Sequence, residues 1–425
     1  MHQKVDERTW EQSMQATLKN GLRVALGREP YRRTVNLGLF IESGSGYETL
    51  EDNGISHFAE HVLFHGPHLT RPARSLLEEL VEAGMKYEAY TSKDYTRFVL
   101  TCLPEHLSDA TRLMGMVASA REVASSAIDH ERPIILHEHA MSFTSSRIIL
   151  TEMLDYALWG NASLGLFVIG RRENIERFSK PQLDDLVSRR HIPGRAFLIA
   201  LGPFDPDKLV AEAETCFEHW QGVSTIYEEK KVVAKPEMVA LPRASDRADL
   251  LLGYVGVPFT STDRLAMELL ADILGAGLKS RLFVELVQRR KLAYLARAYP
   301  VTYKRGGYVG IHVNCERKDV PEVFAAIAEQ LRLLRNEGVR ADEIARAKAG
   351  RSMEVLNAVE SSVKHLHLVG YRAMMGESFS AEGEIQRIRE ARREDVIRLA
   401  RQMLTPENAG VVGLGLSEAE FRDIA

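Results

Sequence analysis

The chain repeats a pattern of its first half about 210 residues later. The stretches IERFSKPQLDDLVSRRHIPGRAFLIALG (175–202) and IQRIREARREDVIRLARQMLTPENAGVVGLG (385–415) both indicate a helix, a second helix with an acidic start, a turn proline and an apolar strand. A second matching pair is LLEELVEAGMKYEAYTS (76–92) and LFVELVQRRKLAYLARA (282–298). Such a repeat predicts two duplicated halves of about 200 residues each.

Within each half, helical patterns lie between pairs of strand-like runs. In the first half, Asn20-Gly21 is a two-residue hairpin signal, and helices are expected at 54–65, 71–83, 106–119 and 129–155. Paired strands favour an antiparallel or mixed sheet over a doubly wound parallel one, so we expect an α+β fold.

A charged stretch divides the two halves. YEEKKVVAKPEMVALPRA, at 227–244, interrupts the pattern of helices and strands and is typical of a linker. We therefore expect an N-terminal domain at 1–226, a linker at 227–244 and a C-terminal domain at 245–425.

Composition excludes several classes of protein. A net charge of -4 and a pI near 6.4 give no support for a nucleic-acid or anionic-membrane partner. No apolar run approaches the roughly 18 residues of a membrane helix, and residues 1–13 lack the apolar core of a signal peptide. Cys102, Cys216 and Cys315 are odd in number and far apart, which indicates no disulfide framework. A cytoplasmic location is the simplest expectation.

The stretch HFAEHVLFHG, at 57–66, carries four ligand-type side chains on an otherwise apolar helix. Positions i, i+3 and i+4 share one helix face, so His57, Glu60 and His61 project together. Unpaired imidazoles are costly to bury, and this favours a metal site over satisfied core histidines. His65 lies at the expected helix end before Gly66, and we place it at the periphery.

A metal held by two histidines needs a third ligand, and the candidates cluster in DHERPIILHEHAM at 129–141. On a helix, Glu131 and Glu138 are seven residues apart and share a face, whereas His137 and His139 point elsewhere. Spacing alone excludes none of the candidates, which are His130, Glu131, His137, Glu138 and His139.

Two imidazoles with a carboxylate suit Zn²⁺, and a catalytic site leaves one position for water. Bound zinc lowers the pKa of water from about 15.7 to about 7, and Glu60 can accept the proton. The order HxxEH reverses HExxH and gives the same arrangement with the opposite chain direction.

At this point the sequence resembles the pitrilysin/insulinase family of inverted-motif zinc metallopeptidases, in particular its short-chain, mitochondrial-processing-peptidase-like branch. The resemblance rests on SGSGYETLEDNGISHFAEHVLFHG, YEAYTSKDYTRF, ERPIILHEHA, SRLFVELV and LAY. It implies the mitochondrial-processing-peptidase/LuxS-like metallohydrolase fold. It also implies one zinc ion per chain, held by His57, His61 and Glu138, with Glu60 as proton acceptor and Glu131 as the acidic helper that supports the site. Glu138 lies 77 positions after His61, as the family pattern requires.

Two positions depart from the family pattern. Glu88-Ala89 stands where the family usually has Asn-Ala before the strand that pairs with substrate. Glu88 either favours a basic group on the peptide or faces solvent. The family's substrate-binding Arg/Tyr pair is represented by Tyr294, but Val287 occupies the arginine position. The second half also has no HxxEH motif, and we expect it to hold no metal.

The resemblance implies a zinc-dependent endopeptidase that cleaves unfolded peptides, or removes a leader from a precursor peptide, inside a closed chamber. Because Val287 replaces the arginine, we expect a heterodimer with a related subunit that carries the Arg/Tyr pair, with a homodimer as the alternative. The competing functions are a non-catalytic substrate-binding or structural homologue and a small-molecule metallohydrolase.

Overall fold

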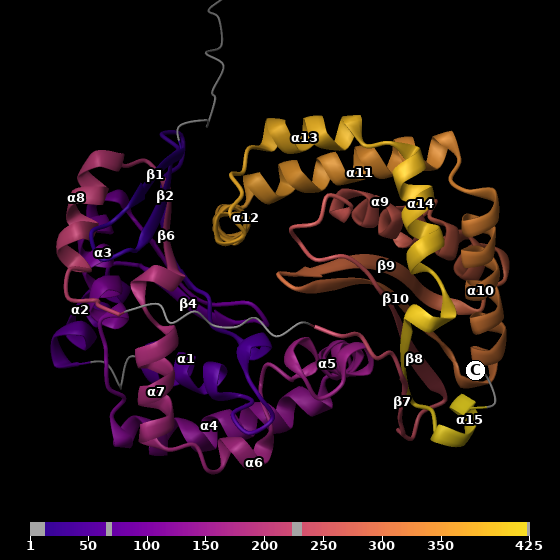
Figure 1. Cartoon of the computed structure of the whole chain (residues 1–425), viewed down its shortest axis with the longest axis horizontal. Coiled ribbons are helices and arrows are strands. Elements are labelled where there is room, and N and C mark those ends of the chain that lie inside the picture. Colours follow the sequence, from indigo (N-terminus) through magenta and orange to yellow (C-terminus); the bar gives the residue numbers. More distant parts are fainter. Residues whose placement is uncertain (1–12, 65–69, 223–231, 423–425) are drawn as a thin grey trace, which may run out of the picture.

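The computed structural model describes residues 13–64, 70–222 and 232–422, which form two mixed sheets flanked by helices (Figure 1). The first sheet has the order β1-β2-β6-β3-β5-β4, with bounds Ser13–Thr17 (β1), Arg23–Arg28 (β2), Ala196–Gly202 (β6), Val35–Ile41 (β3), Thr96–Cys102 (β5) and Lys86–Thr91 (β4). The second has the order β7-β11-β8-β10-β9, with bounds Met238–Leu241 (β7), Ala409–Leu414 (β11), Arg247–Val255 (β8), Gly306–Glu316 (β10) and Ala293–Tyr303 (β9).

Five strands of the first sheet, in the order β2-β6-β3-β5-β4, match the second sheet strand for strand, which confirms the duplicated α+β fold; among the described residues, β1 has no counterpart in the second sheet. β2 pairs in parallel with β6 as β7 does with β11, and the strands that follow pair antiparallel in both sheets. The helices follow the same order. In the first half they are α1 (Ile55–Phe64), α2 (Arg71–Glu82), α3 (Leu107–Ala118), α4 (Ser125–Thr144), α5 (Ser146–Trp159), α6 (Arg172–Ile175), α7 (Lys180–Arg190) and α8 (Pro206–Cys216). In the second half they are α9 (Arg264–Gly275), the π-helical turn η6 (Phe283–Arg289), α10 (Val320–Glu337), α11 (Ala341–Glu360), α12 (Ser362–Met374), α13 (Ala381–Glu390), α14 (Arg393–Met403) and α15 (Glu418–Arg422).

The expected hairpin between β1 and β2 is present, but its loop is longer than two residues. Leu18 and Leu22 close the hairpin, with the Leu18 N–H donating to the Leu22 carbonyl at 2.8 Å, and three residues lie between them. Gly21 has φ +92°, a value that glycine adopts without steric cost. A three-residue loop with glycine in the left-handed region is a common hairpin form.

The single helix expected at 129–155 is wrong. The structure has two helices, α4 and α5, separated by Ser145, whose backbone is extended (φ -78°, ψ 110°). Hydroxyl side chains compete with backbone hydrogen bonds, and here Thr144 Oγ1 donates to the Met141 carbonyl at 2.7 Å. The break changes the direction of the chain, so that α5 can reach the second sheet.

Helices α5 and α12 are exchanged between the halves. α5 packs against β8 and β11 of the second sheet, while its counterpart α12 packs against β3 and β6 of the first (Figure 1). Leu154 and Leu158 of α5 lie in one apolar cluster with Leu251 and Val412. Leu366 of α12 lies in another, with residues of the first sheet. Each half therefore completes part of the core of the other.

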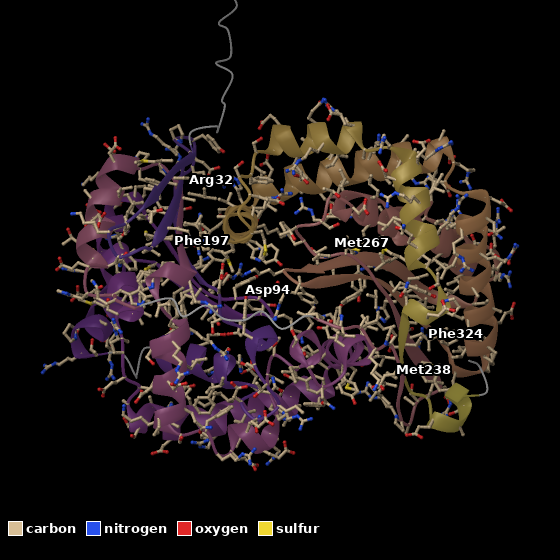
Figure 2. The ribbon with its side chains drawn as sticks, in the orientation of Figure 1. Arg32, Asp94, Phe197, Met238, Met267 and Phe324 are labelled. Atoms are coloured by element: carbon tan, nitrogen blue, oxygen red, sulfur yellow. The ribbon has the colours of Figure 1, made fainter. Side chains whose placement is uncertain are left out.

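Polar contacts at the tip of the β4–β5 hairpin also join the halves. Asp94, which Figure 2 places between them, accepts a hydrogen bond from the Lys304 N–H at 2.9 Å and another from the Tyr371 hydroxyl at 2.8 Å. Lys93 is buried and lies 3.2 Å from Asp155 of α5. These contacts fix the end of β4 relative to α5.

The segment expected as a linker contains both described and undescribed residues. Residues 227–231 lie outside the described ranges, and Met238–Leu241 form β7 at the edge of the second sheet. The domain boundaries at 226 and 245 therefore stay a prediction. Within the described part of the chain, no helix is both long and apolar enough to cross a membrane.

Candidate zinc site

The first turn of α1 is held by a buried carboxylate and by a close backbone approach. Glu48 accepts hydrogen bonds from the Gly54 N–H at 2.7 Å and the Ser56 N–H at 2.9 Å, and so caps two of the amides that a helix start leaves open. Gly54 has φ +101°, and a Cβ on it would lie 2.8 Å from the Gly170 Cα. The start of α1 therefore accepts only glycine at this position.

α1 and α4 bring two imidazoles and one carboxylate together. Glu138 Oε2 lies 3.3 Å from His61 Nε2 and 3.8 Å from His57 Nε2. The three ligand atoms lie within 4.8 Å of one another, and this is the one such cluster of metal-ligand side chains among the described residues. The histidines are buried, whereas the Glu138 side chain is 48% exposed. The cluster is therefore open to solvent on one side.

This donor set fits a zinc ion. A tetrahedral ion with bonds of about 2.0 Å separates its ligand atoms by about 3.3 Å. The separations from Glu138 Oε2 are close to that value, and all three ligand atoms lie within 4.8 Å of one another, so the side chains would have to move closer together to close the site around an ion. Imidazole nitrogen with carboxylate oxygen is also the donor chemistry that zinc accepts.

Glu131 orients the His61 ring by contacting Nδ1, the ring nitrogen that does not face Glu138. The buried Glu131 carboxylate lies 3.0 Å from His61 Nδ1, which leaves Nε2 directed at Glu138. Burial lowers the pKa of His61, but hydrogen bonds to Glu138 and Glu131 outweigh it, and the net pKa is raised. A bound cation competes with that proton, so metal binding releases it.

We expect Glu131→Gln to weaken zinc binding by about 10- to 100-fold, because a neutral amide no longer raises the basicity of His61. Competition with a chromophoric chelator measures the affinity. Asp129→Asn, an exposed position two residues earlier on α4, is the matched control and should leave the affinity unchanged. Equal affinities for the Glu131→Gln and wild-type proteins would contradict a supporting role for Glu131.

Glu60 lies beside the ligands with its carboxylate held in place. The Thr91 hydroxyl, at the end of β4, donates to Glu60 Oε2 at 2.5 Å. Burial raises the pKa of Glu60 to about 6, and the Thr91 hydrogen bond opposes this. A carboxylate with a pKa near 6 accepts a proton more readily than an exposed one.

A cavity of about 610 Å³ opens over this cluster and is bordered by the edge strand β4. Ala89 and Thr91 lie on its wall with His57 and Glu60. Glu88 does not line it. Its side chain is 47% exposed and forms an ion pair at 3.1 Å with Arg97 of β5. Besides binding a basic group of the peptide or facing solvent, Glu88 thus has a third possible role: it balances the charge of Arg97 within the sheet.

The structure places Tyr294 away from this cavity. The tyrosine is the second residue of β9, an edge strand of the second sheet. It is 84% exposed and lines a different cavity of about 870 Å³. Val287 packs against the core of the second half. The neighbouring Arg290 pairs with Glu285 at 2.7 Å. Among the described residues, none of these reaches the cavity over the His57 cluster.

The other candidate ligands lie apart from the cluster. His130 is 56% exposed, and its Nδ1 lies 3.3 Å from Glu131 Oε1, whereas His61 contacts Oε2. His137 is exposed, and the His139 ring packs against Phe143 with 4.7 Å between centroids. His65 lies outside the described residues.

The second half has an arginine paired with acidic side chains on the two helices that correspond to α1 and α4. α9, the counterpart of α1, carries Glu268 and Asp272 with the four-residue spacing of the two α1 histidines. From α11, the counterpart of α4, Arg351 Nη2 lies 2.7 Å from Asp272 Oδ1, and its Nη1 lies 2.8 Å from Glu354 Oε2. Burial raises the pKa of Asp272 to about 7, while Arg351 opposes this.

Two duplicated halves, of which one carries an HxxEH helix beside a sheet edge, define the class of inverted-motif zinc proteases. The model of the insulinase family, peptidase family M16, matches residues 23–171, and the model of the peptidase M16 inactive domain matches residues 177–351. The chain therefore belongs to the pitrilysin/insulinase family, a family of zinc proteases.

Similar proteins include two uncharacterized zinc proteases. That of Bacillus subtilis is 26% identical over 394 residues, which cover 92% of this chain and 96% of that protein. That of Rickettsia felis is 27% identical over 391 residues, which cover 91% and 94%. A solved structure of a protease from Helicobacter pylori has the same fold, with a TM-score of 0.84 at 19% identity over 95% of this chain and 99% of that one.

Sequence reasoning missed Glu48 and Thr91, which position α1 and Glu60. Thr91 carried a signal, because it lies two residues after Ala89 and thus on the same face of the expected edge strand. Glu48 carried little signal, since its role depends on a loop that folds back onto the helix start.

Proposed function

We propose that this chain is a zinc-dependent endopeptidase. One observation carries the proposal: the Glu60 carboxylate lies next to the His57, His61 and Glu138 ligand atoms. Thr91, at the end of the exposed edge strand β4, holds this carboxylate. When bound, zinc would lower the pKa of a water molecule and polarise the peptide carbonyl.

Glu60 performs the proton transfers. Its carboxylate accepts a proton from the attacking water and passes it to the leaving amine, so that it is ionised again at the end of the cycle. The Thr91 hydroxyl holds one carboxylate oxygen and leaves the other available. Burial supports the transfer because it brings the pKa of Glu60 closer to neutral pH.

The edge strand β4 binds the substrate. Its outer N–H and C=O groups are not used by β5, so an extended peptide can add to the sheet as a further strand. The small Ala89 side chain lines the cavity and takes up little of the space between the strand and the ligand cluster. An unfolded segment fits this geometry better than a compact small molecule does.

In this proposal the chain is the catalytic subunit of a dimer that closes a chamber around the peptide. The exposed Tyr294 would face the site of a partner, and the core-packed Val287 leaves the arginine position to a different, related subunit. Purifying the native complex and identifying its chains by mass spectrometry tests this idea. A complex that contains this chain alone would contradict the heterodimer and leave the homodimer.

Peptide cleavage tests the proposed function. The purified chain is incubated with a mixed peptide library, with and without a chelator, and the products are identified by mass spectrometry. We expect internal cuts that disappear with the chelator and return with zinc. A zinc-loaded chain that cuts no peptide would favour the non-catalytic homologue, and cleavage restricted to small amides would favour a metallohydrolase of small molecules. The cytoplasmic location stays a prediction from the cysteine pattern.

A further inference from the structure

The cavity over the ligand cluster is lined by one arginine, Arg147, at the start of α5. The residue is exposed, and within the described residues its guanidinium has no carboxylate partner. Ile148 and Thr151 of α5 also line the cavity, as do Ala89 and Tyr90 of β4.

The acidic groups of the cavity are already engaged. Glu60 and Glu138 belong to the proposed zinc site. Glu152 lies 3.1 Å from Lys93 Nζ and also accepts a hydrogen bond from the Val168 N–H at 3.2 Å. Among the charged side chains that line the cavity, Arg147 is therefore the one without an opposite charge beside it in the described part of the chain.

A second cation strengthens the positive potential at this end of α5. Arg243 Nη1 donates to Ser146 Oγ at 2.7 Å, and its Nη2 donates to the Thr144 carbonyl at 3.3 Å. The N-terminus of α5 adds a partial positive charge, but the C-terminus of α4, which ends at Thr144, adds a partial negative one at the same place, so the favourable field comes from the two guanidinium groups. A carboxylate that enters the cavity next to Arg147 therefore meets a favourable field.

The side chains of an extended peptide on β4 alternate, so every second one points into the cavity. A side chain that points toward α5 can contact the apolar surface of Ile148 and the Arg147 guanidinium, which both line the cavity. Glu88 does not line the cavity, and Arg97 already pairs with it.

We propose that Arg147 selects peptide substrates with an acidic side chain near the bond that is cleaved. This inference rests on the proposed function and names its substrate class. Arg147 acts as a specificity residue through its charge, and it takes no part in the proton transfers.

Two readouts test the proposal. To measure cleavage, the wild-type chain is given peptides that differ only by Glu, Gln or Lys at one position. The positions are those around an established cut site, or those across a fixed library sequence. The affinities of these peptides are measured separately on zinc-loaded Glu60→Gln protein by fluorescence anisotropy. We expect at least one position at which Glu exceeds Lys by about fivefold or more in kcat/KM and in affinity, as for a partly exposed ion pair.

The variant Arg147→Glu should reverse this preference to Lys, both in cleavage and in the Glu60→Gln background. Arg189→Glu makes the same charge change on α7, at a side chain that is 70% exposed and outside the cavity, and should keep the preference for Glu.

The outcomes separate the two proposals. Cleavage with the same preference in the wild-type and Arg147→Glu proteins overturns the role of Arg147 and leaves the peptidase proposal intact. Binding that prefers Glu and reverses with Arg147→Glu, without any cleavage by the wild-type chain, supports Arg147 and overturns the peptidase proposal. A zinc-loaded protein that binds none of the peptides overturns both.

Discussion

Glu60→Gln is expected to lower the rate of peptide cleavage by about 10²- to 10⁴-fold while the chain still binds zinc. Glutamine has the same shape, and its amide oxygen can still accept the Thr91 hydrogen bond, so the cavity keeps its form. The amide cannot take up the proton of the attacking water. Single-turnover cleavage measures the rate, and elemental analysis measures the bound zinc.

Glu212→Gln is the matched control for this change. Glu212 lies on α8 and outside the cavity, where it forms a weak surface pair with Lys208 at 3.8 Å, so its replacement should leave cleavage unchanged. A Glu60→Gln protein that holds zinc and cleaves at more than a tenth of the wild-type rate would show that Glu60 is not the proton acceptor.

Arg351→Met is expected to destabilise the protein by about 1–3 kcal/mol at neutral pH, because it leaves the nearly buried Asp272 carboxyl, whose pKa is about 7 even beside Arg351, to take up a proton and lose its hydrogen bonds. Methionine keeps most of the packing volume, so the charge is the main loss. Urea denaturation followed by circular dichroism measures the free energy of unfolding.

Two further variants separate charge from packing. The double variant Asp272→Leu with Arg351→Met should recover most of the loss, since the buried carboxyl is removed together with its partner. Arg346→Met on the same helix removes a surface pair with Asp342 at 3.7 Å and should cost less than about 1 kcal/mol. Equal losses for the Arg351→Met and Arg346→Met proteins would mean that Arg351 adds nothing beyond a surface pair.

The ligand helix was accessible to sequence reasoning because its signal is local. His57, Glu60 and His61 share a face at any point along a regular helix, and α1 ends within a residue of the expected bounds. Glu138 was different, since spacing alone left five candidates and the family resemblance selected one. The structure places that residue at 3.3 Å and 3.8 Å from the two histidines.

Features that depend on strand register or on packing between the halves were not accessible. Arg97 reaches Glu88 because it stands opposite Tyr90, one step diagonally across the β4–β5 ladder. The helical pattern of 129–155 did not reveal the break at Ser145, because the local pattern contains no information on the distant second sheet against which α5 packs. Arg147 lies at the start of α5, so its position in the cavity depends on the same break.

The most direct test of the zinc-peptidase account is a titration of the metal-free chain with zinc, with the initial rate of peptide cleavage recorded at each addition. The account predicts no cleavage by the metal-free chain and a linear rise that ends at one equivalent of zinc per chain. In a His61→Ala protein the rise should be absent. Cleavage without metal, or a rate that does not respond to the first equivalent, would contradict the account.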